Sequence, residues 1–177
     1  MEKSKVYFTK IITPEKMIEM EEILGRELKG KVAVKLHSGE VGNQNFLRPE
    51  FMKPVIEKVN GTVVECNTAY EGQRNTTEAH WHTMEKHGWS KLFPVDILDE
   101  DGGLELPVIQ KNFVGDHLKN YDSMLVLTHF KGHPMGGYGG ALKNISIGLA
   151  SSYGKAYIHG AGVAENIWSS DHDQFLE

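Results

Sequence analysis

The chain has 177 residues, a length that suits one globular domain with a sizeable hydrophobic core. Hydrophobic residues make up 40% and charged residues 24% of the sequence, both ordinary values for a globular protein. The net charge of −5 and the lack of a basic run argue against a nucleic-acid partner. The single cysteine excludes an internal disulfide and a cysteine-ligated cluster within the chain.

The first residues contain no apolar stretch of signal-peptide length, and no window approaches the length of a membrane span. We therefore expect a cytoplasmic protein that has no membrane partner.

The first half of the chain predicts strands that alternate with helices. We expect strands over residues 6–12, 31–37 and 62–66, and helices over residues 15–28, 49–60 and 76–87. Thr13 followed by Pro14 is favourable chemistry for the start of the first helix, and Gly30 is the predicted stop before the second strand.

The second half continues this pattern. We expect strands over residues 92–98 and 123–128, a β segment over 104–109, a short helix over 115–121 and a helix over 141–150. Strands that alternate with helices imply βαβ units, so the sequence predicts a single three-layer α/β domain over residues 1–177 with a mainly parallel sheet.

One stretch, residues 128–144 (THFKGHPMGGYGGALKN), joins a predicted buried central strand to a predicted helix. A buried strand, a glycine-rich turn and a helix start together present backbone N–H groups to an anion. Neither G-x-x-x-x-G-K-[ST] nor G-x-G-x-x-G is matched. The candidate anion-binding residues of this stretch are Lys131, Gly136, Gly137, Tyr138, Gly139, Gly140, Lys143 and Asn144.

Two histidines are candidates for proton transfer, because an imidazole exchanges a proton near neutral pH. His133 lies within the glycine-rich stretch, and His37 follows the second predicted strand. Further ligand-binding candidates are polar residues in the loops after other strands, where ligands of parallel sheets bind: Arg48, Asn67 and Arg74.

Each candidate also has a purely structural interpretation. The glycines could form a tight turn that packs helix against sheet, His37 could be a hydrogen-bonded core histidine, and Arg48 could pair with an acidic neighbour. His80 and His82 cannot share one helix face, so we expect them to have surface or structural roles.

Several segments resemble the family of uncharacterised proteins known as domain of unknown function 362. They are VKLHSGEVGNQNFLRPE, NTAYEGQR, the glycine-rich stretch and the later Gly-Lys and His-Gly pairs. Members of that family are often described as iron–sulfur-centre proteins, with 4Fe–4S clusters held by cysteines that this chain lacks. Many members are longer, so the resemblance implies that this chain is an amino-terminal part of such a protein.

A fainter resemblance links the chain to nickel-dependent lactate racemase. It implies that His133 does acid/base work, that Lys143 could carry a nickel pincer cofactor and that His159 could ligate nickel. Arg48 followed by Pro49 is similar to the substrate-binding Arg-Pro of that family. Leu142 departs from the racemase pattern, which has arginine directly before the lysine.

These observations predict an enzyme or redox-enzyme subunit, either an oxidoreductase or an isomerase, that binds a small anionic substrate or cofactor at the glycine-rich stretch. One alternative is a non-catalytic module that binds an anionic ligand. Another is a structural fragment whose site needs a further carboxyl-terminal part, in which case an unpaired sheet edge would favour a homo-oligomer.

Overall fold

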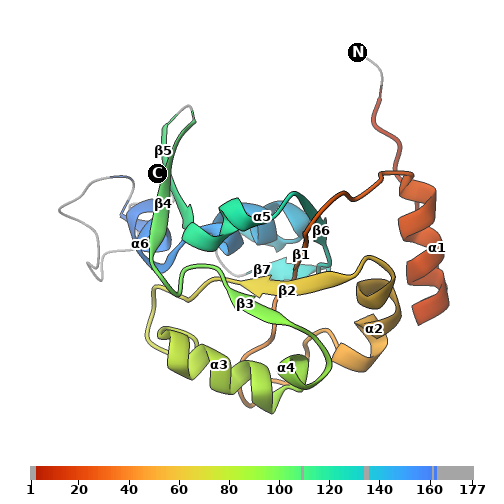
Figure 1. The fold of residues 1–177 in the computed structure, drawn as a ribbon, viewed down its shortest axis with the longest axis horizontal. Coiled ribbons are helices and arrows are strands. Elements are labelled where there is room, and N and C mark those ends of the chain that lie inside the picture. Colours follow the sequence, from red (N-terminus) through yellow and green to blue (C-terminus); the bar gives the residue numbers. More distant parts are fainter. Residues whose placement is uncertain (1–2, 109, 134–135, 161, 163–177) are drawn as a thin grey trace.

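The computed structural model describes residues 3–108, 110–133, 136–160 and 162. Its centre is a four-stranded parallel sheet with the strand order β3-β2-β1-β6 (Figure 1). The strands are β1 (Val32–Lys35), β2 (Gly61–Glu65), β3 (Val95–Ile97) and β6 (Ser123–Val126).

One face of the sheet is covered by α2 (Pro49–Lys58), α3 (Thr77–Lys86) and α4 (Trp89–Leu92), and α1 (Pro14–Leu24) lies beside α2. Thr13 and Thr76 cap α1 and α3 by accepting backbone N–H groups. Val34 and Val63 point into this layer, where they form a core with α2, α3 and α4 side chains such as Met52, Met84 and Trp89. α1 packs on α2 at the outside of the layer.

The other face is covered by α5 (Ala141–Leu149) and the 3-10 helix η1 (Asp116–Asn120). Ala33 and Val64 point towards this layer and pack with Leu149 of α5 and Leu118 of η1. Because neighbouring residues of β1 and β2 serve opposite faces, both strands are buried on both sides. The predicted three-layer α/β architecture with a parallel sheet is confirmed.

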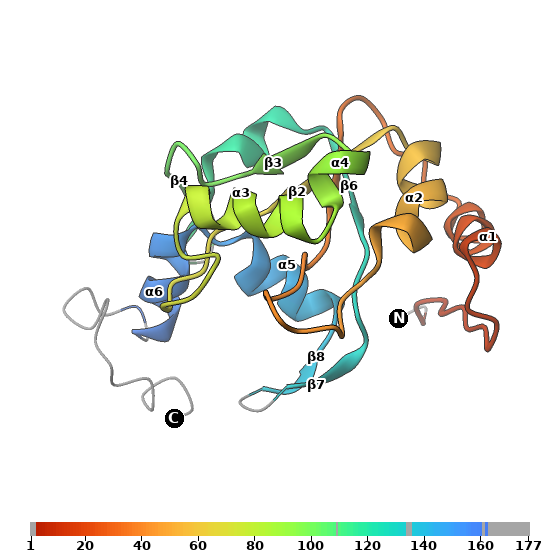
Figure 2. The ribbon, with the colours of Figure 1, turned by 90° about the horizontal axis from the view of Figure 1, so that it is seen from below.

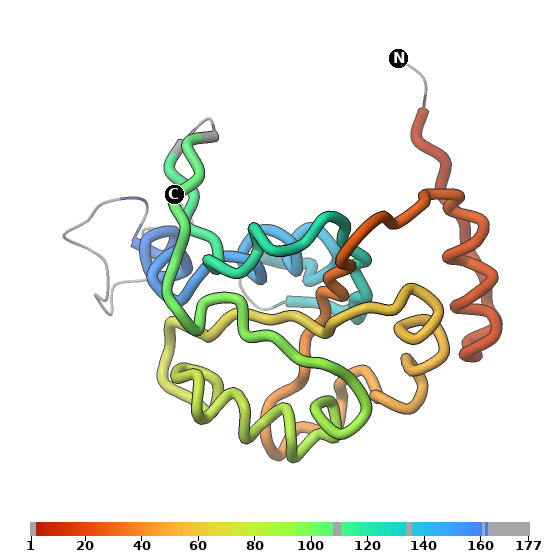
Figure 3. The backbone as a smooth tube through the Cα atoms, viewed as in Figure 1, coloured from red at the N-terminus to blue at the C-terminus, as the bar shows by residue number. Residues whose placement is uncertain are grey.

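Two antiparallel hairpins and one helix complete the described fold. β4 (Gly103–Val108) pairs with β5 (Gln110–Gly115), and β7 (Lys131–His133) pairs with β8 (Gly137–Gly139). α6 (Ser152–His159) packs against β4 and β5. Figure 2 shows β7 and β8 extending away from the sheet, and the tube of Figure 3 shows the β4–β5 hairpin rising from the body.

The structure corrects three expectations about elements. Residues 6–12 form no strand, and Val6 and Phe8 are more than 80% exposed, because no neighbouring strand pairs with this segment. The first helix ends at Leu24, where Gly25 adopts a left-handed conformation with φ of 58°, rather than near Gly30. Strand β6 is not central but lies at the edge of the described sheet, beside β1.

Two β elements were not predicted at their full extent. β5 extends the predicted segment 104–109 into a hairpin, and the glycine-rich stretch itself forms the short β7–β8 pair. Across the described residues, no helix combines the length and apolar character needed to cross a bilayer.

Candidate functional site at the carboxyl edge of the sheet

Charged side chains are buried where β1 and β2 end. Lys35 is the last residue of β1, Glu65 is the last residue of β2, and Arg74 comes from the loop after β2. Each is at most 4% exposed. The Lys35 Nζ lies 3.6 Å and the Arg74 Nη1 lies 3.4 Å from Glu65 Oε1. Buried charges are costly unless paired, so Glu65 neutralises two cations that would otherwise destabilise the fold.

The second oxygen of Glu65 binds groups from two further elements. The Ser38 backbone N–H donates to Oε2 at 2.8 Å, and His80 Nε2 of α3 lies 3.4 Å from the same oxygen. Burial alone would raise the pKa of the Glu65 carboxyl, but the charges of Arg74 and Lys35 outweigh burial and hold this pKa well below its usual range. Glu65 is therefore ionised and serves as the centre of the cluster.

His37 and Glu40 complete the cluster on its solvent side. His37 Nε2 lies 3.2 Å from Arg74 Nη2, and Arg74 also binds Glu40 Oε1 through both Nε and Nη2. Desolvation by the surrounding protein lowers the pKa of His37 to about 4; the Glu65 charge opposes this shift, and the Arg74 charge adds to it. The six residues Lys35, His37, Glu40, Glu65, Arg74 and His80 are called the edge network below.

Asn67 ties the edge network to β3 and α6. Its Oδ1 lies 3.1 Å from His80 Nδ1, and its backbone N–H donates to Asp99 Oδ1 at 2.8 Å. The buried Lys155 amine of α6 donates to the Asn67 carbonyl at 2.7 Å. Asp99 Oδ2 also accepts the Ser152 N–H that opens α6, at 2.7 Å. The loop after β2 is thus held by neighbours on both sides, which gives the site a rigid base.

Asn144 joins the edge network to the glycine-rich stretch. Its Oδ1 accepts a hydrogen bond from Lys35 Nζ at 2.8 Å, and its Nδ2 donates to Thr128 Oγ1 at 2.9 Å. Asn144 lies in the first turn of α5, and its backbone N–H donates to the Gly140 carbonyl. The start of α5 is therefore anchored to the buried end of β1.

Two lysines near the start of α5, Lys131 and Lys143, give this region positive charge. Desolvation lowers the pKa of Lys143, and the charge of Lys131 lowers it further. Desolvation, Lys143 and Lys131, in that order, also lower the pKa of His133. No acidic residue lies in the first turn of α5, and among the described residues no carboxylate forms an ion pair with Lys143. Since a helix start is itself positive, the region carries a local excess of positive charge.

The glycines shape this region through the β7–β8 hairpin. Gly137 has φ of 66°, a conformation that residues with a side chain rarely adopt. A Cβ on Gly140 would lie 2.0 Å from the Tyr138 hydroxyl, so this glycine lets the ring fold back against the chain. The Gly136 N–H donates to His133 Nδ1 at 3.0 Å, which puts the proton of the neutral ring on Nε2. Gly139, the last residue of β8, is buried and pairs with Lys131 of β7.

The structure thus separates the predicted residues. His37, Asn67 and Arg74 belong to or contact the edge network, Asn144 is bonded to Lys35 of that network, and Lys131, His133 and Lys143 influence one another by charge. Arg48 lies elsewhere: it is exposed, its guanidinium stacks over the Phe46 ring at 4.3 Å, and it donates to the Gln44 carbonyl. His159 closes α6.

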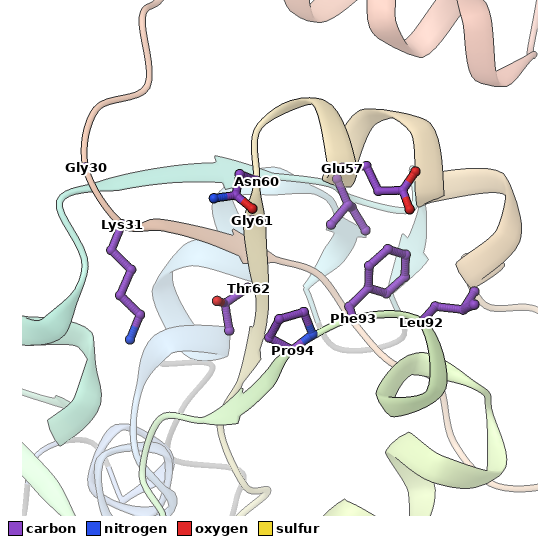
Figure 4. Close-up of a pocket in the computed structure, with 10 residues that line it drawn as sticks. Gly30, Lys31, Glu57, Asn60, Gly61, Thr62, Leu92, Phe93 and Pro94 are labelled. Carbon is purple, nitrogen blue, oxygen red and sulfur yellow. The ribbon is translucent and has the colours of Figure 1, made fainter.

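A surface pocket of about 340 Å³ lies at the opposite end of the sheet, near the amino ends of β1 and β2 (Figure 4). Lys31, Asn60 and Thr62 contribute to its wall. No predicted site residue lines this pocket, so it is separate from the carboxyl-edge site.

The residues present do not fit an iron–sulfur cluster, which needs several cysteine thiolates. Cys66 is the only cysteine in the chain, it is buried, and its thiol donates to the Leu149 carbonyl at 3.3 Å. Burial raises the pKa of this thiol to about 12, which disfavours the thiolate. Within the described parts of the chain no group of three or more His, Cys, Asp or Glu side chains could hold a metal ion, and ligation by His159 stays a prediction.

Sequence reasoning singled out His37 and Arg74 of the edge network but not Lys35 or Glu65. His80 was expected to have a surface or structural role, and it is fully buried and contacts Glu65, which corresponds to the structural alternative. The sequence contained a signal that His80 is buried, because His80, Thr83 and Met84 recur at helical spacing. In the structure all three are buried.

The comparisons with known proteins identify a family but give no activity. The sequence pattern of the family described as Domain of unknown function (DUF362) matches residues 32–175, which include every strand of the parallel sheet. No curated protein and no solved structure matches the chain. The resemblance to lactate racemase therefore has no support here. Since the matched residues make up most of the sequence, the chain belongs to the DUF362 family.

Proposed function

We propose that this domain is an enzyme or enzyme subunit that binds a small anionic substrate or cofactor between the β7–β8 hairpin and the first turn of α5, with His133 as the proton carrier. The observation that supports this most is the position of Lys143 in the first turn of α5, beside Lys131. Two ammonium groups and a helix start repel one another, and a bound anion would relieve that repulsion.

The edge network also supports this proposal, because it holds the start of α5 in place. Lys35 holds Asn144, so the helix start and the neighbouring Lys143 are fixed before any ligand arrives. Fixed donors and charges stabilise an anion better than flexible ones, because the binding energy is not spent on ordering them.

His133 suits proton transfer because its pKa is lowered by burial and by the two lysines. An anion beside these lysines would offset their charge and raise the pKa of His133 again. Ligand binding would thereby be coupled to proton uptake, which is what a proton carrier needs. The same coupling predicts that an anion binds more tightly as the pH falls.

Isothermal titration with sulfate, which does not titrate near neutral pH, tests the binding step. We expect Lys143→Gln to weaken sulfate binding about tenfold or more, the loss of one charge-assisted hydrogen bond. Lys53→Gln is the matched control, since Lys53 is a helical lysine on α2 whose side chain is 45% exposed. Equal affinity of the Lys143→Gln variant and the wild type would overturn the proposal.

His133→Gln separates an enzyme from a non-catalytic binding module. If His133 carries the proton, this variant keeps sulfate binding but loses its pH dependence. An unchanged pH dependence would favour the binding module.

A further inference from the structure

Arg74 presents two edges of its guanidinium to two different carboxylates. Nη1 faces Glu65 at 3.4 Å, inside the sheet, whereas Nε lies 3.1 Å from Glu40 Oε1 and Nη2 contacts the same oxygen. The Tyr70 hydroxyl donates to that oxygen as well, at 3.3 Å. Three donors from a buried arginine and a tyrosine therefore converge on one carboxylate oxygen, which is how proteins bind a carboxylate ligand.

Glu40 is far more exposed than Arg74, which binds it. Its side chain is 38% exposed, whereas that of Arg74 is 4% exposed. Glu40 lies in the loop between β1 and α2, next to Gly39 with φ of 96° and near Gly42 with φ of 88°. The carboxylate thus comes from a solvent-facing loop, while Arg74 is buried and Tyr70 lies at the surface, 56% exposed.

The charge balance of the cluster favours an anion at this position. Lys35 and Arg74 are two buried basic residues, and Glu65 supplies one buried negative charge that both of them share. Glu40 supplies the second negative charge, so its departure leaves Arg74 with only the shared Glu65 as an acidic partner. Removing one partner of a buried charge is unfavourable, so another anion is favoured beside Arg74 when Glu40 leaves.

We infer that the outer edge of Arg74, together with Tyr70, is a binding site for the carboxylate of a small organic ligand, and that Glu40 occupies this site until the ligand displaces it. The inference goes beyond anion binding at the β7–β8 hairpin and does not depend on it. Glu40 acts as an internal competitor, so the apparent affinity for a carboxylate is the intrinsic affinity multiplied by the fraction of molecules in which Glu40 has left the site.

The test is an NMR titration with acetate that follows the Nε–H signal of Arg74. We expect weak binding to the wild type and binding about tenfold tighter or more to Glu40→Ala, because the competitor is gone. Glu40→Gln, which keeps an oxygen acceptor for Arg74 and so protects the fold, should also bind acetate more tightly than the wild type, by a smaller factor. Acetate should also raise the Tm of Glu40→Ala more than sodium chloride of equal ionic strength does. Glu71→Gln is the matched control, an exposed carboxylate in the loop that carries Tyr70.

Two results would overturn the inference. The first is that Glu40→Ala binds acetate no better than the wild type, and the second is that acetate leaves the Arg74 signal unmoved in Glu40→Ala. Lys143→Gln distinguishes the two proposals, since it should weaken sulfate binding and leave acetate binding at Arg74 unchanged.

Discussion

The buried ammonium of Lys35, at the end of β1, donates a hydrogen bond to the side chain of Asn144 in the first turn of α5, with 2.8 Å between Nζ and Oδ1. By strand alternation Lys35 belongs to the α5 face of the sheet and Glu65 to the α3 face. The chain of contacts from His80 through Glu65 and Lys35 to Asn144 therefore crosses the carboxyl edge of the sheet and connects both helical layers.

Asn144→Ala should loosen the start of α5. The variant removes the side-chain acceptor of Lys35, and we expect a loss of about 1–3 kcal/mol in the free energy of unfolding, the cost of an unsatisfied buried donor. It should also weaken sulfate binding, because Lys143 is no longer held in place. Urea unfolding and titration measure the two effects. Asn75→Ala, at an exposed asparagine, should change neither.

Lys35→Met should be among the most destabilising single changes in the sheet. It leaves Glu65 with less positive charge around it in the core, and breaking a buried ion pair in this way costs about 3–5 kcal/mol. Urea unfolding of Lys35→Met and of the double variant Lys35→Met with Glu65→Gln measures the coupling. The double variant should recover part of the loss; a double variant as unstable as the sum of both single ones would argue against a direct interaction.

Acidification should unfold the protein through the edge network. The pKa of Glu65 is depressed in the folded state, so its contribution to stability is present above the unfolded value of about 4.3 and is lost as the pH falls towards the folded pKa. The pKa of His37 is also depressed, so the free energy of unfolding decreases as the pH is lowered from about 6.5 to about 4. Because one side of His37 is exposed, its share is smaller than that of a fully buried group.

Tm measured against pH for the wild type, Glu65→Gln and His37→Gln checks these signs. Glu65→Gln should flatten the curve at the acidic end, and His37→Gln should flatten it between mildly acidic and neutral pH. A wild-type Tm that rises on acidification over this range would contradict both assignments.

His117 should act in the opposite direction. Its Nδ1 lies 2.7 Å from Asp96 Oδ1 and its Nε2 lies 2.9 Å from Asp101 Oδ2, and hydrogen bonds to these two carboxylates raise the pKa of His117. A raised folded pKa gives stability that is fully present below the unfolded value of about 6.5 and is lost as the pH rises through the folded pKa. His117→Gln should therefore lower the Tm at mildly acidic pH and have little effect in alkali. An NMR titration of His117 reads the pKa directly.

The strands and helices of the parallel sheet were predictable because their signals are local. The apolar run of β1, the Thr76 cap of α3 and the proline that opens α2 each fix an element from a few neighbouring residues. Residues 6–12 show the limit of that reasoning, since their loose alternation suits a strand but none of the described strands pairs with them.

The edge network could not be read in the same way. Lys35 in an apolar strand looks like a solvent-facing residue, and Glu65 looks like an ordinary strand end. Only the parallel pairing of β1 with β2, in the register Lys35 opposite Val64, brings their charged ends together. The topological rule that ligands bind at carboxyl ends correctly pointed to this edge, and it brought His37, Asn67 and Arg74 into one cluster but not Arg48.

A sulfate titration followed by NMR of the backbone amides tests the central claim most directly. Binding at the helix start should shift the amide signals of Ala141, Leu142 and Lys143 together, and Lys143→Gln should remove the shifts. Shifts confined to residues around the Figure 4 pocket, such as Lys31 and Asn60, or no saturable shift in α5, would contradict an anion site at the carboxyl edge.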